Sequence, residues 1–151
     1  TYGMADGTGT AARFRYPEGV AVSPDGGTVY VADRANHRIR KIDTSGATTT
    51  LAGSDTSGFA DGTGTAASFN FPAGVAVSPD GMTVYVADTY NNRIRKIDTS
   101  GGVTTTLAGS TFGFADGTGT AASFFAPSGV AVSPDGGTVY VADMINHRIR
   151  Q

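Results

Sequence analysis

The chain has 151 residues, and its 11 Lys and Arg against 13 Asp and Glu give a formal net charge of −2 at pH 7. This balance gives no reason to expect nucleic acid or an anionic membrane as a partner. The absence of cysteine excludes a disulfide framework and a thiolate metal site. No apolar run approaches the roughly 20 residues that cross a bilayer as a helix.

The sequence repeats itself at a spacing of 55 residues. The run D-G-T-G-T-A-A begins at Asp6, Asp61 and Asp116, and the runs G-V-A-V-S-P-D-G and V-Y-V-A-D recur at the same spacing. A fixed period of this kind is typical of solenoids, propellers and arrays, whose units bury their faces against one another. We therefore expect a single repeat domain over the whole chain. Its units are 1–55, 56–110 and 111–151, the last of them truncated.

Each unit is expected to form four short strands joined by turns. In the first unit the strands are expected at 20–22, 28–32, 38–42 and 47–51. The run S-P-D-G ends the first of them, because Pro presets φ for a turn and Gly tolerates the conformation that follows. Short strands with turns this close favour an all-β fold. Repetition of one strand quartet favours a β-propeller, in which each blade is one four-stranded sheet.

The repeated runs resemble a known family. P-x-G-V-A-V-S-P-D-G, V-Y-V-A-D, N-H-R-I-R-K-I-D and T-T-L-A-G, in this order, are similar to NHL repeats over the whole chain. The chain departs from the N-H-R run once, where Asn92 stands in the position that His37 and His147 hold in the other units. The resemblance implies blades of a propeller that is typically six-bladed. It also implies a binding platform for protein or RNA and, in a minority of members, a lyase or hydrolase with a metal on the central axis.

Three blades do not close a ring, since propellers have about four to eight. The third blade is also expected to lack its outer strand, which leaves Arg148, Ile149 and Arg150 at a bare edge. Each end of the chain then offers an apolar face that is built to pack against another blade. We expect two chains to close a six-bladed ring as a homodimer, with a monomeric remnant of a longer protein as the alternative.

Positions that differ between the units gather in the loops that lead into the first strand and in those between the second and third strands. Because strands alternate in direction within a blade, both sets of loops share one rim. Function is often carried by loops on a rigid scaffold, and drift where packing constrains least is the alternative. The candidate binding residues on this rim are Arg13, Arg15, Arg34, His37, Tyr90, Asn92, Met144 and His147. The basic members suit an anion and the apolar ones a peptide groove.

Three aromatic residues of the lead-in loops, Tyr16, Phe71 and Phe125, are expected in the core between blades. Three aspartates each precede an arginine by five residues. Because this arrangement recurs identically in every blade, we expect a structural ion pair that stabilises the hairpin, or a turn cap. The pairs are Asp33 with Arg38, Asp88 with Arg93 and Asp143 with Arg148.

Catalytic chemistry finds little support in the sequence. His37 and His147 have no Glu or Cys nearby with which to bind a metal, and every Ser falls in a turn or polar loop. The sequence therefore predicts a non-enzymatic scaffold or binding module without a cofactor, which forms a homodimer through its open blade faces and takes a protein or peptide ligand on the rim. An engineered or excised repeat fragment without a ligand is the first alternative. A metal-dependent lyase or hydrolase of the NHL type is the second, although the axial strand offers only Val20, Ala21 and Val22.

Overall fold

The computed structural model describes residues 3–151, and the first two residues of unit 1–55 lie outside that range. The described chain is all β, with three antiparallel sheets and no α-helix in residues 3–151. The strands are β1 (Gly7–Thr8), β2 (Pro17–Val22), β3 (Thr28–Asp33), β4 (Arg38–Asp43), β5 (Ala47–Gly53), β6 (Gly62–Thr63), β7 (Pro72–Val77), β8 (Thr83–Asp88), β9 (Arg93–Asp98), β10 (Val103–Ala108), β11 (Pro127–Val132), β12 (Val139–Asp143) and β13 (Arg148–Arg150). Short 3-10 helices lie between them: η1 (Gly9–Ala11), η2 (Arg34–Asn36), η3 (Gly64–Ala66), η4 (Thr89–Asn91) and η5 (Gly119–Ala121).

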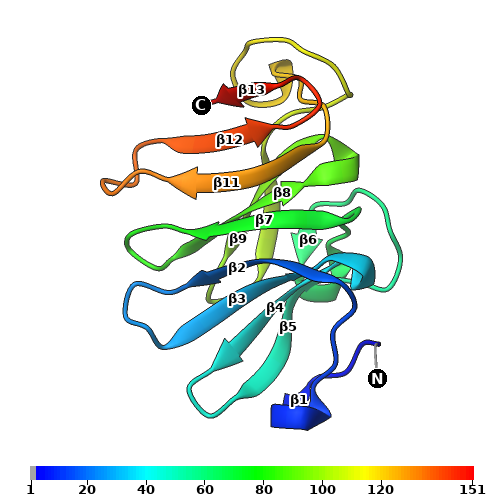
Figure 1. Ribbon diagram of the computed structural model, residues 1–151, viewed down its shortest axis with the longest axis vertical. Helices are drawn as coiled ribbons and strands as arrows, with labels where there is room; N and C mark the ends of the chain where they lie inside the picture. The colour runs from blue at the N-terminus through cyan, green and yellow to red at the C-terminus, as the bar shows by residue number, and fades with distance from the viewer. Residues whose placement is uncertain (1–2) are drawn as a thin grey trace.

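Each sheet is one propeller blade. Blade 1 has the strand order β1-β5-β4-β3-β2, blade 2 the order β6-β10-β9-β8-β7, and blade 3 the order β11-β12-β13. Figure 1 shows the blades stacked from blue to red, with β2, β7 and β11 side by side. The tight turns that follow these three strands lie at one edge of the picture, and the loops that lead into them lie at the opposite edge. The predicted all-β propeller fold is confirmed.

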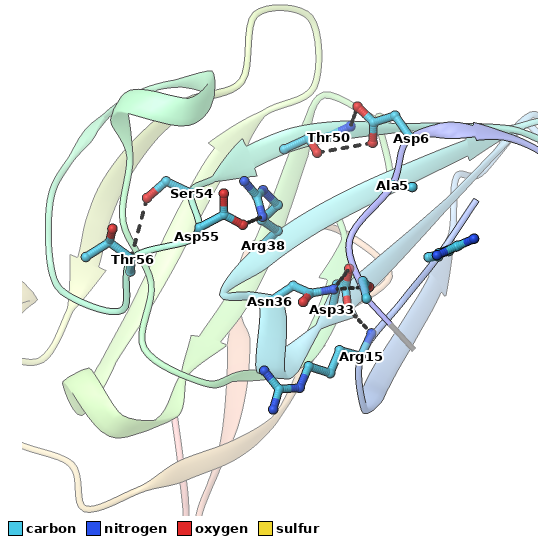
Figure 2. A network of polar contacts seen from close by, with 12 residues as sticks. Ala5, Asp6, Arg15, Asp33, Asn36, Arg38, Thr50, Ser54, Asp55 and Thr56 are labelled. Carbon is cyan, nitrogen blue, oxygen red and sulfur yellow. Dashed lines mark hydrogen bonds and ion pairs between the residues drawn. The ribbon is translucent and has the colours of Figure 1, made fainter. Parts of the chain in front are cut away.

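Blades 1 and 2 contain an outermost strand that the sequence did not indicate. The D-G-T-G-T run forms it: Gly7 in β1 lies opposite Thr48 in β5, and β6 pairs with β10 in the same way. The carboxylate of Asp6 accepts hydrogen bonds from the N–H and the hydroxyl of Thr50, both at 3.3 Å (Figure 2). This strand covers the outer edge of the blade, which would otherwise offer unpaired main-chain groups to another chain.

The apolar core lies between successive blades. Tyr30, Ile39 and Leu51 of blade 1 are buried against Phe69 and Val84 of blade 2. A second cluster joins blades 2 and 3 and consists of Ala87, Ile94, Ala122, Phe124 and Val141. Burial of one large apolar side chain is worth about 1.5–3 kcal/mol. The blades therefore stabilise one another, as repeats with shared cores do.

The innermost strands approach so closely that glycine is required between them. A Cβ atom built on Gly74 in β7 would lie 2.5 Å from the carbonyl oxygen of Ser128 in the next blade. A Cβ atom on Gly19 in β2 would meet the carbonyl oxygen of Ala73 in the same way. Main-chain atoms of neighbouring blades are thus in direct contact, and these contacts set the distance between blades.

A buried arginine ties each blade together. The guanidinium of Arg40 in β4 lies 2.9 Å from the carboxylate of Asp33, and both side chains are fully buried. The same guanidinium lies 2.6 Å from Asp6, at the start of the D-G-T-G-T run. It therefore joins the third strand of the blade to the segment that carries the outermost strand. Arg95 and Arg150 form the same bridge in blades 2 and 3.

Several hydrogen bonds compensate these buried charges, as burial requires. Asp33 accepts from the N–H of Arg15 at 2.8 Å and from the side chain of Asn36 at 2.9 Å (Figure 2). Arg40 also donates to the carbonyl oxygens of Ala5 and Arg13. The first residue of the N-H-R and N-N-R runs thus supports the ion pair of its own blade.

The predicted ion pair between Asp33 and Arg38 is wrong. The two residues lie opposite each other in β3 and β4, and Arg38 binds Asp55 at 2.6 Å instead (Figure 2). Residues at i and i+2 of a strand share a face, so Arg38 and Arg40 are both oriented for a contact with Asp33. The arginine further into the sheet, Arg40, takes the buried carboxylate. Sequence spacing alone does not distinguish the two.

The same correction holds in the other two blades. Asp88 and Asp143 bind the arginine at the later position, with distances of 2.8 Å and 3.0 Å. The arginines that were predicted as their partners lie over aromatic rings: Arg93 over Phe59 at 3.9 Å from the ring centre, and Arg148 over Phe114 at 3.8 Å. A cation on an aromatic face contributes about 0.5–2 kcal/mol, so these arginines still stabilise their loops.

Candidate functional site

Two sets of loops meet along one side of the stack, which we call the upper rim. Main-chain hydrogen bonds join the two sets within each blade: Ala35 donates to Arg15 at 3.0 Å, Tyr90 to Asn70 at 3.0 Å and Ile145 to Phe125 at 3.1 Å. The upper rim consists of the lead-in loops 13–16, 68–71 and 123–126 and of the turns 34–37, 89–92 and 144–147. The predicted binding residues all fall on these segments.

Left-handed backbone recurs at two places in every blade. The last residue of each lead-in loop has a φ angle near 50°: 49° at Tyr16, 52° at Phe71 and 50° at Ala126. The last residue of each turn has a φ angle of 55°, at His37, Asn92 and His147. This conformation is uncommon for residues other than glycine, so its recurrence indicates a structural requirement.

The requirement is a hydrogen bond from one blade to the next, which we call the joint hydrogen bond. At the first joint the N–H of Phe71 in blade 2 donates to Nδ1 of His37 in blade 1 at 3.2 Å. At the second joint the N–H of Ala126 in blade 3 donates to Oδ1 of Asn92 in blade 2 at 2.9 Å. Histidine and asparagine supply the same acceptor, which explains why both occur at this position.

His37 serves the joint in its neutral form. Burial, together with the positive charges of Arg15 and Arg38, holds the pKa of its imidazole below the usual value. A hydrogen bond accepted by Nδ1 places the ring proton on Nε2. Protonation of Nδ1 would replace the acceptor with a second donor, and the joint hydrogen bond would be lost.

Aromatic and charged side chains gather where blades 1 and 2 meet. The ring of Phe71 packs edge-on against His37 with centroids 4.7 Å apart, and its centroid lies 5.0 Å from that of Tyr90. The guanidinium of Arg34 lies 5.1 Å from the ring centre of Phe71 and 5.9 Å from that of Tyr90. It also lies 2.9 Å from the carboxylate of Glu18. We call these five residues the rim cluster. Tyr90 is 55% exposed, so the cluster presents an accessible aromatic face.

The three aromatic residues expected in the core lie elsewhere. Tyr16 is 75% exposed, Phe125 is 39% exposed and Phe71 belongs to the rim cluster. The aromatic side chains that fill the blade joints are Phe69 and Phe124, which precede the left-handed residue by two positions. At Tyr16 and Phe71 the left-handed backbone breaks the alternation of an extended chain, and the side chain turns toward the rim. Phe125 instead follows the buried Phe124 and packs against Phe112, with ring centroids 5.7 Å apart.

The structure brings some of the predicted site residues together and separates others. Arg34, His37 and Tyr90 belong to the rim cluster, and Asn92 belongs to the joint between blades 2 and 3. Arg13 lies apart from them, where its main chain pairs with the segment before β1. Sequence reasoning missed Glu18 as a site residue, although it varies between the units as the predicted residues do.

Met144 and His147 lie on the face of blade 3 that points away from blades 1 and 2. Together with Ile149 they line a hollow of about 270 Å³. They occupy the positions that Arg34 and His37 hold in blade 1, where those residues receive Phe71. The hollow therefore has the make-up of one half of a further blade joint.

The rim cluster offers contacts for recognition: an exposed aromatic ring, a guanidinium held against aromatic faces and a carboxylate. Among residues 3–151, no three side chains of His, Asp or Glu lie close enough together to hold a metal ion. Within that same range, no helix has the length and apolar character that a bilayer span needs.

Known proteins share this sequence pattern. The NHL repeat matches residues 14–42, 69–97 and 126–151. NHL repeat-containing protein 2 from Homo sapiens is 35% identical over 99 residues, which make up 64% of this chain and 14% of that protein.

Solved structures share the fold. An auxiliary nutrient binding protein from Bacteroides thetaiotaomicron is similar with a TM-score of 0.76 and 25% identity, over 86% of this chain and 35% of that chain. A catalytically inactive virginiamycin B lyase from Staphylococcus aureus is similar with a TM-score of 0.59 and 18% identity, over 89% of this chain and 36% of that chain. The chain thus spans well under half the length of these relatives. With three matched repeats, three antiparallel blades and propeller relatives, the chain belongs to the NHL repeat family.

Proposed function

We propose that this chain is a non-enzymatic binding scaffold, which closes a six-bladed ring with a second copy of itself and presents its upper rim to a protein or peptide ligand. The NHL propeller fold supports a binding module, because recognition is often carried by loops on a rigid scaffold. The nutrient-binding relative is consistent with such a role. The likeness to the lyase, at 18% identity, concerns the fold alone.

The observation that carries the proposal is the match between the two end faces of the stack. Ile39 and Ile94 are 0% and 1% exposed because the next blade covers them, whereas Ile149 at the same position of blade 3 is 74% exposed. On the opposite face, Val75 of blade 2 is 7% exposed and Val20 of blade 1 is 63% exposed. Blade 3 therefore exposes the kind of face that, in blades 1 and 2, is covered by the following blade. Blade 1 exposes the kind of face with which blades 2 and 3 cover the preceding blade.

The joint hydrogen bond extends the same complementarity. His147 carries the acceptor that His37 uses, and Tyr16 carries the left-handed N–H that Phe71 donates. In the proposed ring, the N–H of Tyr16 from one copy donates to His147 of the other. The ring of Tyr16, 75% exposed in the single chain, then enters the hollow beside Met144.

Two copies related by a two-fold axis cover both end faces of each copy. Two copies with three blades each give six, within the usual range for propellers. Each copy contributes one face of each kind, so the new joint forms twice and no apolar end face remains. Exposed contiguous apolar faces commonly mark an interaction surface.

Light scattering over a dilution series tests the ring. We expect twice the 15.3 kDa mass of one chain. Ile149→Asp places a charge on the end face of blade 3 and should give a monomer, as should Val20→Asp on the other end face. Ile145→Asp is the matched control, because Ile145 is exposed on the upper rim. A wild-type monomer at every concentration, or a dimer that survives both substitutions, refutes the proposal.

The upper rim is the proposed site for the ligand. Tyr90 and Ile145 are 55% and 44% exposed there and lie away from the joint between the copies, and Arg34 adds a positive charge. Aromatic, Met and Arg side chains are enriched where proteins bind one another. These features favour a protein or peptide segment over a small anion.

A peptide-display selection tests the rim. Peptides selected on the wild-type protein should lose binding to the Tyr90→Ala and Arg34→Ala variants. They should keep binding to Met82→Ala, whose side chain is 66% exposed beside the tight turn on the opposite rim. Peptides that bind all three variants equally well would place the ligand elsewhere.

A further inference from the structure

The outer part of blade 3 borders a hollow of about 780 Å³ that the proposed ring and rim do not use. Ile94 and Leu107 of blade 2 line it together with Phe124 of blade 3. Asp116 and Arg150 line it as well, with carboxylate and guanidinium 2.8 Å apart. An apolar lining with a few placed polar groups is the usual make-up of a binding site.

In blade 2 the corresponding space is filled by the protein's own fourth strand, β10. Ile97 in β9 and Thr104 opposite it in β10 are 0% and 1% exposed. The carboxylate of Asp61 accepts a hydrogen bond from the N–H of Thr106 at 3.3 Å and another from its hydroxyl at 3.2 Å. Blade 1 contains the same two hydrogen bonds.

Blade 3 keeps the groups that receive such a strand. Within residues 3–151, β13 pairs with β12 alone, so its other edge carries unpaired main-chain groups. The side chain of Asp116 is 82% exposed, and in the described structure its carboxylate binds Arg150. Thr118, before η5, has φ −99° and ψ 134°, close to −105° and 129° at Thr63 in blade 2. Thr118 thus already has the backbone conformation of its counterpart in a blade with four strands.

We propose that this edge of blade 3 binds an extended peptide, which adds antiparallel to β13 as the fourth strand of the blade. In such strand addition, main-chain hydrogen bonds supply affinity and alternate side chains supply specificity. A threonine of the peptide donates both its N–H and its hydroxyl to Asp116. The residue two positions earlier is β-branched and enters the hollow.

The register follows from blade 1. There Thr50 and Ala52 of β5 lie opposite the arginine and the isoleucine of β4. The bound peptide should therefore place threonine opposite Arg150 and alanine opposite Ile149. The peptide residue that corresponds to Thr48, which is 3% exposed in blade 1, should enter the hollow. These positions define the pattern Thr-x-Thr-Leu-Ala-Gly. The occupant is thus a threonine-rich extended segment.

The test uses a fluorescent peptide with the sequence of residues 45–54, S-G-A-T-T-T-L-A-G-S. Fluorescence anisotropy with the 151-residue protein should show saturable binding of one peptide per chain. A peptide with valine in place of the third threonine keeps the β-propensity and loses the hydroxyl. It should bind about tenfold more weakly, the effect of one hydrogen bond to a charged group.

Variants of the protein supply the second arm of the test. Asp116→Asn should weaken binding by about the same factor of ten. Asp25→Asn is the matched control, since Asp25 lies in an exposed tight turn of blade 1, away from the hollow, and should not affect the peptide. Hydrogen exchange of the main-chain amides at 148–151 should slow when peptide is bound, and this measurement requires no variant.

Val20→Asp separates this proposal from ring closure. It alters the end face of blade 1 and leaves β13 intact, so this variant should bind the peptide whether or not the wild-type protein forms a dimer. Absence of saturable binding, equal binding of a scrambled peptide, or unchanged exchange at 148–151 would overturn the proposal.

Discussion

Nδ1 of His37 accepts a hydrogen bond from the main-chain N–H of Phe71, 3.2 Å away in the next blade. Asn92 accepts the equivalent bond from Ala126 at 2.9 Å. A titratable side chain and a non-titratable one therefore hold equivalent joints of the same chain. The first joint should respond to pH, and the second should not.

We expect the protein to lose stability as the pH falls below about 6.5, the ordinary pKa of histidine. The folded-state pKa of His37 is lowered by burial and by two arginines. As the pH drops, the unfolded chain takes up a proton first, so the free energy of unfolding decreases until the pH reaches the folded-state pKa. Urea denaturation across this range measures the effect. His37→Asn should flatten the profile, and an unchanged slope in that variant would contradict the assignment.

Loss of the buried guanidinium should destabilise the central blade strongly. Arg95→Met leaves the carboxylate of Asp88 buried without its ion-pair partner, which costs about 3–5 kcal/mol in free energy of unfolding. Lys96→Met is the matched control, because the neighbouring Lys96 side chain is exposed. Urea denaturation should separate the two variants clearly. A loss below about 1 kcal/mol for Arg95→Met would mean that the bridge contributes no more than a surface ion pair.

The main-chain contact between blades predicts a sharp difference between two glycines. Gly74→Ala drives a Cβ atom against the carbonyl oxygen of Ser128 and should cost about 1–3 kcal/mol, as overpacking does. Gly58→Ala meets no heavy atom within 4 Å and should change stability by about 1 kcal/mol or less. Thermal unfolding followed by circular dichroism compares them. Equal melting temperatures would show that the blades can move apart at no cost.

In the proposed ring, Tyr16 is the side chain that seals the joint between the copies. Tyr16→Ala should raise the dissociation constant of the dimer roughly thirtyfold, corresponding to about 2 kcal/mol for an aromatic anchor. Tyr90→Ala, which removes another exposed tyrosine away from the end faces, should leave the dissociation constant unchanged. Sedimentation equilibrium of the two variants gives both values. A dimer that is equally tight in both would remove Tyr16 from the interface.

The blades could be predicted because every unit contains the same strand and turn signals. The strands expected at 20–22, 28–32, 38–42 and 47–51 all lie within β2 to β5. The outermost strand β1 could not be predicted, since it has only two residues and one of them is glycine, a residue depleted in strands. It depends on Asp6, which is held by Arg40 from 34 residues further along the chain.

The site was predictable as a region and not as a set of contacts. Variation between the units located the upper rim, and Arg34, His37 and Tyr90 do meet there. The position of Phe71 was missed because its left-handed backbone is stabilised by an acceptor in the preceding blade. A contact of that kind depends on the packing of two units and has no signature within either one.

Successive blades approach each other through main-chain atoms at Gly19 and Gly74, and the N–H groups of Phe71 and Ala126 each donate to an acceptor side chain of the preceding blade. The main-chain groups at each joint are therefore the same, and either His37 or Asn92 supplies the acceptor that they need. Units 1–55 and 56–110 are therefore interchangeable with respect to these contacts. Shuffling, gaining or losing whole units would change the side chains displayed along the upper rim and preserve the step from blade to blade. Recombination of whole units therefore produces new binding surfaces without any change in how the blades pack.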